Sequence, residues 1–326
     1  MERVLSGMRP TGYLHLGNYI GALKQWVELQ DKYQCFYMVA DLHAMTTDFD
    51  RNINLRELTL EMVIDWLSSG VDPNRSVVFV QSMVPEHSEL FAILSMITPI
   101  GWLERNPTYK ETKENLQDRD LNNIGFLAYP VLQAADIVIY KATRVPVGKD
   151  QLPHLEITRE IVRRFNYLFG EVFPEPQPIL GEVAHVYGTD GRKMSKSYNN
   201  AIYFKDSEEE IYNKIKIMVT DTNRIRRSDP GNPDNCKTFP LYKIFYQEIL
   251  DTVIDECTSA KIGCVECKDR IAKKVIEKLS PIKEKRRYYE KNIDEVIDIL
   301  KEGSKKAREI ARETMEEVRE VMKMKI

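Results

Sequence analysis

The chain has 326 residues, of which 30% are charged and 43% hydrophobic, and its net charge is −3. These values are typical of a globular protein with a large core and predict two domains. No apolar run is long enough to cross a bilayer, which excludes a membrane-spanning protein. Five cysteines are too few for a disulfide scaffold in a chain of this size. Met1 leads directly into an apolar strand without a secretory signal, so we expect a cytoplasmic protein with no membrane partner.

The two parts of the chain carry opposite net charge. Residues 1–190 contain 17 Lys and Arg against 25 Asp and Glu, whereas residues 191–326 contain 30 against 25. A basic C-terminal part attached to an acidic N-terminal part indicates that only the C-terminal part approaches a polyanion.

The first predicted elements are an apolar strand over residues 4–8, a turn over 9–18 and the start of a helix. Apolar side chains recur at helical spacing from Leu16 onward, so the turn lies at a helix N-terminus. Unpaired N–H groups there favour phosphate, Gly17 lets another group approach closely, and His15 can donate a hydrogen bond. The turn is therefore either a phosphate site or an ordinary connection with a hydrogen-bonded histidine.

Further strands and helices alternate after this turn. Strands are predicted over residues 35–40 and 77–80, with a helix over 55–69 between them and a mostly helical insertion over about 86–125 after them. This alternation predicts a parallel sheet with helices on its faces.

The next helix carries three polar residues on one side. It is predicted to begin at Tyr129, with Pro130 in its first turn, and Tyr129, Gln133 and Asp136 then share one face. A buried carboxylate needs a partner, so Asp136 either forms a structural ion pair or cap, or accepts a hydrogen bond from a ligand. A short strand over 144–148 follows, and residues 149–151 at its carboxyl end occupy the usual position of ligand contacts.

A basic loop follows a proline-rich stretch. Residues 188–197 combine turn residues, small hydroxyls and cations without periodicity, which indicates either a flexible loop that closes over phosphates or an exposed lysine-rich turn. From about residue 206 the pattern is helical, and the tail from Lys305 has one apolar face that packs on a core. We therefore place a second, helical domain over residues 200–326, after a first domain over 1–199.

Four of the five cysteines lie close together in the basic part. Cys35 stands in an apolar run and is interpreted as a small core residue. The others have the spacing Cys236-x20-Cys257-x6-Cys264-x2-Cys267. Four thiolates bind zinc or a [4Fe–4S] cluster, and zinc sites usually show two close pairs, whereas one C-x-x-C occurs here. Four thiols without a metal are a third possibility.

Two motifs in this order carry a resemblance to a known family. His15-Leu16-Gly17-Asn18 and Lys193-Met194-Ser195-Lys196-Ser197 resemble the signatures of class I aminoacyl-tRNA synthetases. Residues 6–12, 17–22 and 146–151 are similar to bacterial tryptophanyl-tRNA synthetases, and the similarity covers essentially the whole chain. It implies an α/β, Rossmann-like parallel-sheet catalytic domain and a C-terminal α-helical domain that binds the tRNA anticodon.

The resemblance implies an activity and roles for individual residues. The enzyme would activate L-tryptophan with ATP and Mg²⁺ to tryptophanyl adenylate, release pyrophosphate and transfer the amino acid to tRNA(Trp), with His15, Lys193 and Lys196 as catalytic residues. ATP would contact Arg9, Pro10, Thr11, Gly17, Asn18, Gly148, Lys149, Asp150, Val186, Met194, Ser195 and Ser197. Asp136 would accept the indole N–H of tryptophan, surrounded by Tyr129, Gln133 and His43.

Three positions depart from the family pattern: Arg9 stands where relatives often have Gln, Gln133 where many have Met, and Lys149 where Glu is usual. The set of Tyr129, Gln133 and Asp136 also resembles tyrosyl-tRNA synthetase, although the first fifty residues favour tryptophan. Two further functions compete with tryptophan–tRNA ligation: an adenylyl-transferring relative that uses no tRNA, and a non-catalytic RNA-binding iron–sulfur protein. The intact His15, Lys193 and Lys196 argue against the second of these.

The resemblance also bears on the cysteines and on assembly. Their spacing looks like the iron–sulfur motif of a subset of bacterial tryptophanyl-tRNA synthetases, which favours a [4Fe–4S] cluster on Cys236, Cys257, Cys264 and Cys267, with zinc second. Relatives are homodimers, so we expect a homodimer.

Overall fold

The computed structural model of the chain describes residues 1–107, 109–110, 121–181 and 186–325. Within these ranges, only the backbone is described for Asp150 and Ser197. Of the helical insertion predicted over about 86–125, residues 108 and 111–120 lie outside these ranges. No helix among the described residues is long and apolar enough to cross a membrane.

Five parallel strands form one sheet in the order β3-β2-β1-β4-β5. The strands are β1 (Arg3–Met8), β2 (Gln34–Val39), β3 (Ser76–Val80), β4 (Arg144–Val147) and β5 (Gln177–Leu180). The first four confirm the predicted strands. The fifth was missed because Pro178 lies in it, and proline is tolerated there because β5 is an edge strand.

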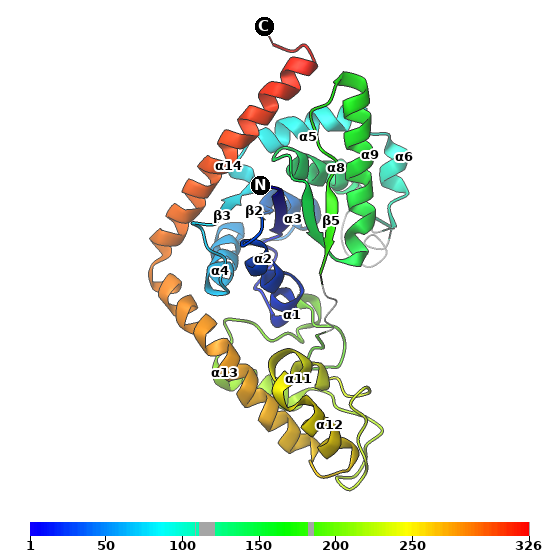
Figure 1. Cartoon of the computed structure of the whole chain (residues 1–326), viewed down its shortest axis with the longest axis vertical. Helices are drawn as coiled ribbons and strands as arrows, with labels where there is room; N and C mark the ends of the chain where they lie inside the picture. Colours follow the sequence, from blue (N-terminus) through cyan, green and yellow to red (C-terminus); the bar gives the residue numbers. More distant parts are fainter. Residues whose placement is uncertain (108, 111–120, 182–185, 326) are drawn as a thin grey trace.

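The sheet is buried on both faces. Successive strand residues point to opposite sides, so Cys35 belongs to one apolar cluster and Phe36 to the other. Cys35 is fully buried, which confirms its interpretation as a core residue. The predicted Rossmann-like parallel sheet is thereby confirmed, and helices cover both faces (Figure 1).

Helices of the N-terminal half follow the strands. They are α1 (Leu16–Asn18), the π-helical turn η1 (Tyr19–Leu23), α2 (Lys24–Leu29), α3 (Asp41–Asp48), α4 (Leu55–Ser68), η2 (Gln81–Met83), α5 (Glu86–Ile97) and α6 (Ile100–Glu104). The helix predicted over 55–69 is confirmed as α4, and the Asn54 side chain caps it by accepting the N–H of Glu57 at 3.2 Å.

The helix that carries Asp136 begins earlier than predicted. It is α8 (Ile124–Val138), and Asn123 caps it by accepting the N–H of Phe126 at 2.9 Å. Pro130 therefore lies inside the helix, and the prediction that it occupies the first turn was wrong because the cap signal at Asn123 was overlooked. The elements η3 (Lys149–Gln151) and α9 (Leu152–Phe169) complete the half.

The C-terminal half is helical, as predicted. After η4 (Lys196–Tyr198) it contains α10 (Glu208–Ile217), α11 (Phe239–Phe245), η5 (Gln247–Ile249), α12 (Leu250–Thr258), α13 (Cys264–Lys291) and α14 (Ile293–Val321). The two long helices α13 and α14 run along one side of the molecule (Figure 1). The apolar face predicted for the tail is confirmed: Thr314 and Val318 are buried, and Val318 joins the cluster that contains Phe36.

Helix α14 covers the open edge of the sheet at β3. A side chain at Gly303 would collide with the carbonyl oxygen of Val78, so only glycine allows this approach. The next residue, Ser304, accepts the backbone N–H of Val80 at 3.2 Å through its hydroxyl oxygen. The helix thus protects an edge strand and lies against the segment that leads into η2.

Candidate active site

The predicted phosphate turn and the basic loop meet, although the contacting residues Gly12 and Lys196 are 184 positions apart in the chain. Lys196 Nζ donates a hydrogen bond to the carbonyl oxygen of Gly12 at 2.8 Å. Just beyond the basic loop, the Leu16 N–H donates to the carbonyl oxygen of Ile202 at 2.9 Å, and the Phe204 N–H donates to that of Leu14 at 3.3 Å. Backbone pairing therefore holds the two motifs together.

The turn requires glycine at two positions. Gly12 has a φ of +148°, and a Cβ there would lie 3.2 Å from Lys196 Cδ. A Cβ at Gly17 would lie 2.9 Å from both Cε1 and Nδ1 of His15, so glycine lets the imidazole lie over the helix start. Asn18 Oδ1 accepts the His15 N–H at 3.1 Å, which fixes the first turn.

Burial and neighbouring charges set the protonation of this cluster. Burial, assisted by Lys196 and Lys193, lowers the pKa of His15 to about 4. Burial and Arg9 lower the pKa of Lys196 to about 8, whereas Asp65 opposes that change. At neutral pH a neutral imidazole therefore lies beside a charged ammonium, a combination suited to a polyphosphate.

The other residues predicted to contact ATP lie around this meeting point or at the end of β4. Met194 and Val186 are buried, and the Met194 N–H donates to the Val186 carbonyl oxygen at 2.9 Å. Gly148 directly precedes η3, and Lys149, the first residue of η3, is exposed. The predicted roles of the Asp150 and Ser197 side chains lie outside the described part of the chain.

Sequence reasoning missed Asn200, which shapes the basic loop. Its Oδ1 accepts the Ser195 N–H at 2.9 Å, and its Nδ2 donates to Asp190 Oδ1 at 2.7 Å. Asn200 is 2% exposed, and no spacing or periodicity in the sequence signals this role.

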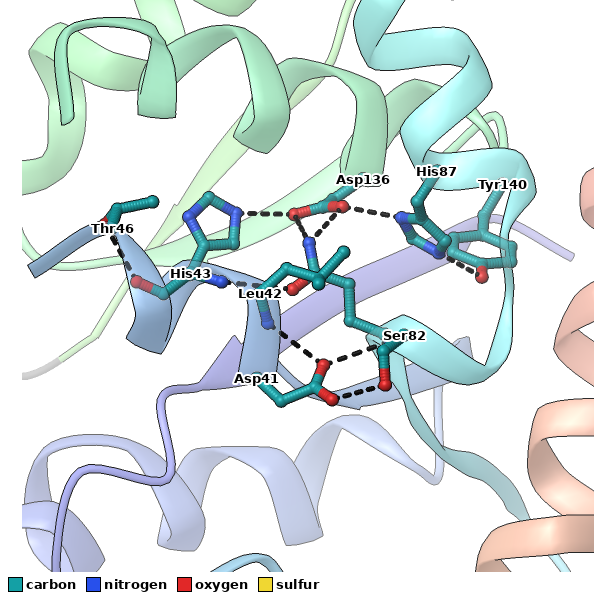
Figure 2. Close-up of polar contacts among 9 residues, drawn as sticks. Asp41, Leu42, His43, Thr46, Ser82, His87, Asp136 and Tyr140 are labelled. Atoms are coloured by element: carbon teal, nitrogen blue, oxygen red, sulfur yellow. Dashed lines mark hydrogen bonds and ion pairs between the residues drawn. The ribbon is translucent and has the colours of Figure 1, made fainter. Parts of the chain in front are cut away.

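Asp136 is the centre of a second polar cluster (Figure 2). His43 Nε2 lies 2.7 Å from Asp136 Oδ2, and His87 Nδ1 lies 2.5 Å from Oδ1. Gln81 Nε2 donates to both oxygens, at 2.8 and 3.0 Å. The other ring nitrogen of His87, Nε2, lies 2.7 Å from the hydroxyl oxygen of Tyr140, so His87 bridges Asp136 and Tyr140. The partners that a structural role for Asp136 requires are therefore present.

This cluster keeps Asp136 charged. Its complete burial favours the neutral acid, but hydrogen bonds from His43 and His87 outweigh burial and lower the pKa of Asp136 to about 2. Gln81, His87 and Tyr140 were not predicted from the sequence as members of this cluster. Gln81 had a usable signal, because it directly follows the predicted strand 77–80 at the carboxyl end of the sheet.

Tyr129 joins a third polar chain at the same end of the sheet. Its hydroxyl lies 2.6 Å from His154 Nε2, and His154 Nδ1 lies 2.9 Å from Gln151 Oε1. Arg9 lies near enough to lower the pKa of Tyr129, although burial raises that pKa to about 12. Gln133 is half-buried on the same helix. The phosphate turn and the face of α8 are therefore neighbours.

The sequence family described as tRNA synthetases class I (W and Y) matches residues 1–280. The chain is 54% identical over 325 residues to a tryptophan–tRNA ligase from Thermotoga maritima, and the match covers 99% of each chain. This chain belongs to the tryptophan–tRNA ligases.

Further relatives agree with this assignment. A tryptophan–tRNA ligase from Aquifex aeolicus is 43% identical and covers 99% of this chain and 100% of its own. The crystal structure of tryptophanyl-tRNA synthetase from Campylobacter jejuni complexed with ADP and tryptophan has a TM-score of 0.88 and 38% identity, and covers 98% of this chain and 99% of its own. A tyrosyl-tRNA synthetase from Archaeoglobus fulgidus is 18% identical and shows the common fold alone. The ligase is thus an aminoacyl-tRNA synthetase for tryptophan, which sets the tyrosyl function aside.

The four clustered cysteines of the ligase line one cavity of about 30 Å³. Arg224 and apolar side chains such as Phe239 and Val253 complete its wall. Burial raises the pKa of Cys267 to about 11 and also raises that of Cys236 and Cys257. Within the described ranges, no three side chains of His, Cys, Asp or Glu are arranged to hold a metal ion.

A basic groove of about 630 Å³ adjoins the cysteine cavity of the ligase. Its lining includes Lys216, Arg224, Arg226, Arg227 and Lys268. Ile225 and Val265 also line it, and they are 88% and 68% exposed. The groove therefore combines cations with exposed apolar side chains.

Proposed function

We propose that the ligase binds ATP between the turn at residues 9–18 and the loop at 188–197, and joins the α-phosphate to the carboxylate of L-tryptophan before transfer to tRNA(Trp). The contact between Lys196 and Gly12 carries this proposal, because it places a cation of the loop against the turn that precedes His15. The remaining ATP contacts would come from the residues named by the family resemblance.

The chemistry requires positioning and charge neutralisation rather than a general base. The tryptophan carboxylate attacks the α-phosphorus, the bond to the bridging oxygen breaks, and pyrophosphate leaves. Neutral His15 is suited to donate to a phosphate oxygen, while Lys193 and Lys196 offset the charge of the β- and γ-phosphates. Mg²⁺ bound to the ATP would share this role.

Asp136 is proposed to accept the indole N–H of tryptophan, with Tyr129, Gln133 and His43 around the ring. The charged carboxylate favours such an acceptor role. Because three side chains already donate to it, the indole N–H must replace one of them. His43 is the best candidate, since its side chain is 12% exposed while His87 and Gln81 are fully buried.

Exchange of pyrophosphate into ATP tests this function, with each amino acid supplied in turn. We expect exchange with tryptophan alone and, when tRNA is added, formation of tryptophanyl-tRNA. Adenylate formation without acylated tRNA would favour an adenylyl-transferring relative. Exchange with tyrosine, or with no amino acid, would overturn the proposal.

The cysteine cavity is proposed to hold a structural [4Fe–4S] cluster on Cys236, Cys257, Cys264 and Cys267. A single zinc ion draws its four sulfurs to within about 4 Å of one another. A cubane binds each thiolate to a different iron and therefore keeps the sulfurs farther apart. The four cysteines line one cavity, and their single C-x-x-C pair, where zinc sites usually show two close pairs, supports the cluster over zinc. Arg224 Nη1, 3.8 Å from Cys264 Sγ, would offset the negative charge of the thiolates.

Anaerobic purification distinguishes the cluster from zinc and from free thiols by metal content. We expect about four iron atoms per chain with visible sulfur-to-iron absorption, both lost in Cys257→Ser. The control Cys35→Ala, in the sheet core, should retain the iron. One zinc per chain, or no metal, would contradict the cluster.

Partners and organisation are proposed from charge and exposure. The basic groove would contact tRNA phosphates, as expected for a helical anticodon-binding domain over residues 200–326. Use of tRNA in turn implies a cytoplasmic location.

A homodimer would cover apolar side chains of α5, α6 and α8, because Met96, Ile100 and Ile124 are 81%, 62% and 81% exposed. Sedimentation analysis showing a monomer at micromolar concentration would contradict the dimer.

A further inference from the structure

Two buried basic side chains of α13 point from the C-terminal helices toward the turn at residues 9–18. Lys283 and Arg286 lie one helical turn apart and are 8% and 4% exposed. Buried cations are costly unless they find partners. The partners of both cations lead to the backbone of Leu14, the residue before His15.

Lys283 reaches Leu14 through the segment that follows the basic loop. Its ammonium donates to the carbonyl oxygen of Phe204 at 3.3 Å and to that of Asp206. The N–H of Phe204 donates to the carbonyl oxygen of Leu14 at 3.3 Å. Lys283 therefore holds residues 202–206, the segment whose backbone pairs with the turn at residues 9–18.

Arg286 reaches Leu14 through α4. Its guanidinium pairs with the carboxylates of Asp65 and Glu61, and with Glu290 at 3.0 Å. Asp65 is 2% exposed, and burial raises its pKa to about 7, a change that Arg286 and the nearby backbone of Leu14 oppose. Asp65 also favours the charged form of Lys196. The two cations of α13 thus support the two sides of one buried residue.

We propose that Lys283 and Arg286 are positioning residues for ATP binding, which hold Leu14 from both sides and thereby set the direction of His15 relative to Lys196. The inference rests on the proposed roles of His15 and Lys196. It gives α13 a function besides that of its first turn, where Cys264 and Cys267 lie. Neither cation touches substrate, so their effect passes through Phe204 and Asp65.

The test compares Lys283→Met and Arg286→Met with Lys285→Met, an exposed lysine on the same helix. Pyrophosphate exchange gives the KM for ATP and for tryptophan, and thermal unfolding reports the fold. We expect the KM for ATP to rise about tenfold in the first two variants, while the KM for tryptophan changes less than about twofold. Arg286→Lys should recover part of the loss, because an ammonium still pairs with Asp65. Lys285→Met should resemble the wild type.

A variant that leaves Asp65 buried without a partner can fail to fold. The double variant Asp65→Asn with Arg286→Met removes both charges and is expected to show the same rise in the KM for ATP. An unchanged KM for ATP in the folded variants, or an equal rise in both KM values, would overturn the inference. His15→Gln and Lys196→Met in the same assay separate the two proposals: if these retain wild-type exchange, the proposed ATP site itself fails.

Discussion

Lys196 Nζ lies 2.8 Å from the carbonyl oxygen of Gly12 and thereby holds the basic loop against the turn at residues 9–18. The contact takes the ammonium out of water, and burial together with Arg9 lowers its pKa to about 8. In the proposed ATP site this ammonium would exchange its backbone acceptor for a phosphate oxygen, so the charge of Lys196 would matter to ATP binding.

The pH dependence of ATP use follows from this pKa. Lys196 carries its charge below pH 8 and loses it above, so kcat/KM for ATP should fall about tenfold per pH unit well above pH 8. Arg9, Asp65 and His15 are the charged or titratable groups that interact with Lys196. Lys196→Arg should remove the alkaline fall, because guanidinium remains charged. Pyrophosphate exchange from pH 6.5 to 9.5 measures both profiles, and an identical fall in the two enzymes would assign it to another group.

His15 makes folding sensitive to mild acid. Its pKa is about 4 in the folded chain and about 6.5 when unfolded, so the unfolded chain binds the extra proton between these values. The free energy of unfolding should therefore decrease as the pH is lowered from about 6.5 to about 4. His15 contributes about 2 kcal/mol to the difference in this free energy between pH 7.5 and pH 5. Urea unfolding of the wild type and His15→Gln at both pH values tests this. Equal losses in the two proteins would contradict a depressed pKa.

Asp136 should be important to stability as well as to substrate choice. Asp136→Ala leaves buried His87 and Gln81 without their acceptor, which should lower the free energy of unfolding by about 2 to 4 kcal/mol. His43→Ala removes the most exposed donor and should cost less than about 1 kcal/mol. Urea unfolding compares the two variants. Amino-acid-dependent exchange should show Asp136→Ala losing discrimination against phenylalanine, and preserved discrimination would remove Asp136 from the tryptophan site.

Gly303, the single glycine of α14, should not tolerate a side chain. Gly303→Ala drives a methyl group into the Val78 backbone and should cost about 3 kcal/mol or more. Gly101→Ala in α6 is a matched control, since a Cβ there meets no atom within 4 Å. Urea unfolding of both variants measures the difference, and similar midpoints would show that α14 moves freely against β3.

Local sequence signals predicted most of the fold. Strands β1 to β4 and helix α4 follow from apolar runs, apolar periodicity and glycine and proline stop signals, because such patterns reflect interactions between neighbours in the chain. The start of α8 was misplaced because a proline was interpreted as a beginning although Asn123 supplies the cap. β5 escaped because Pro178 locally argues against a strand, whereas an edge strand tolerates proline, and the edge is defined by the sheet rather than by the strand.

The sequence by itself predicted a glycine-containing turn suited to phosphate, a basic loop and a carboxylate on an apolar helix, since residue type and spacing encode these features. Only the tertiary structure decided which side chains become partners. Asp136 is held by His43, Gln81 and His87 because parallel strands bring their following segments to one end of the sheet. Lys283 and Arg286 resemble surface charges of a long helix, and only the packing of α13 on α4 and on the segment after the basic loop buries them. Burial changes what a charge must bind, and burial is a property of the folded chain rather than of a local pattern.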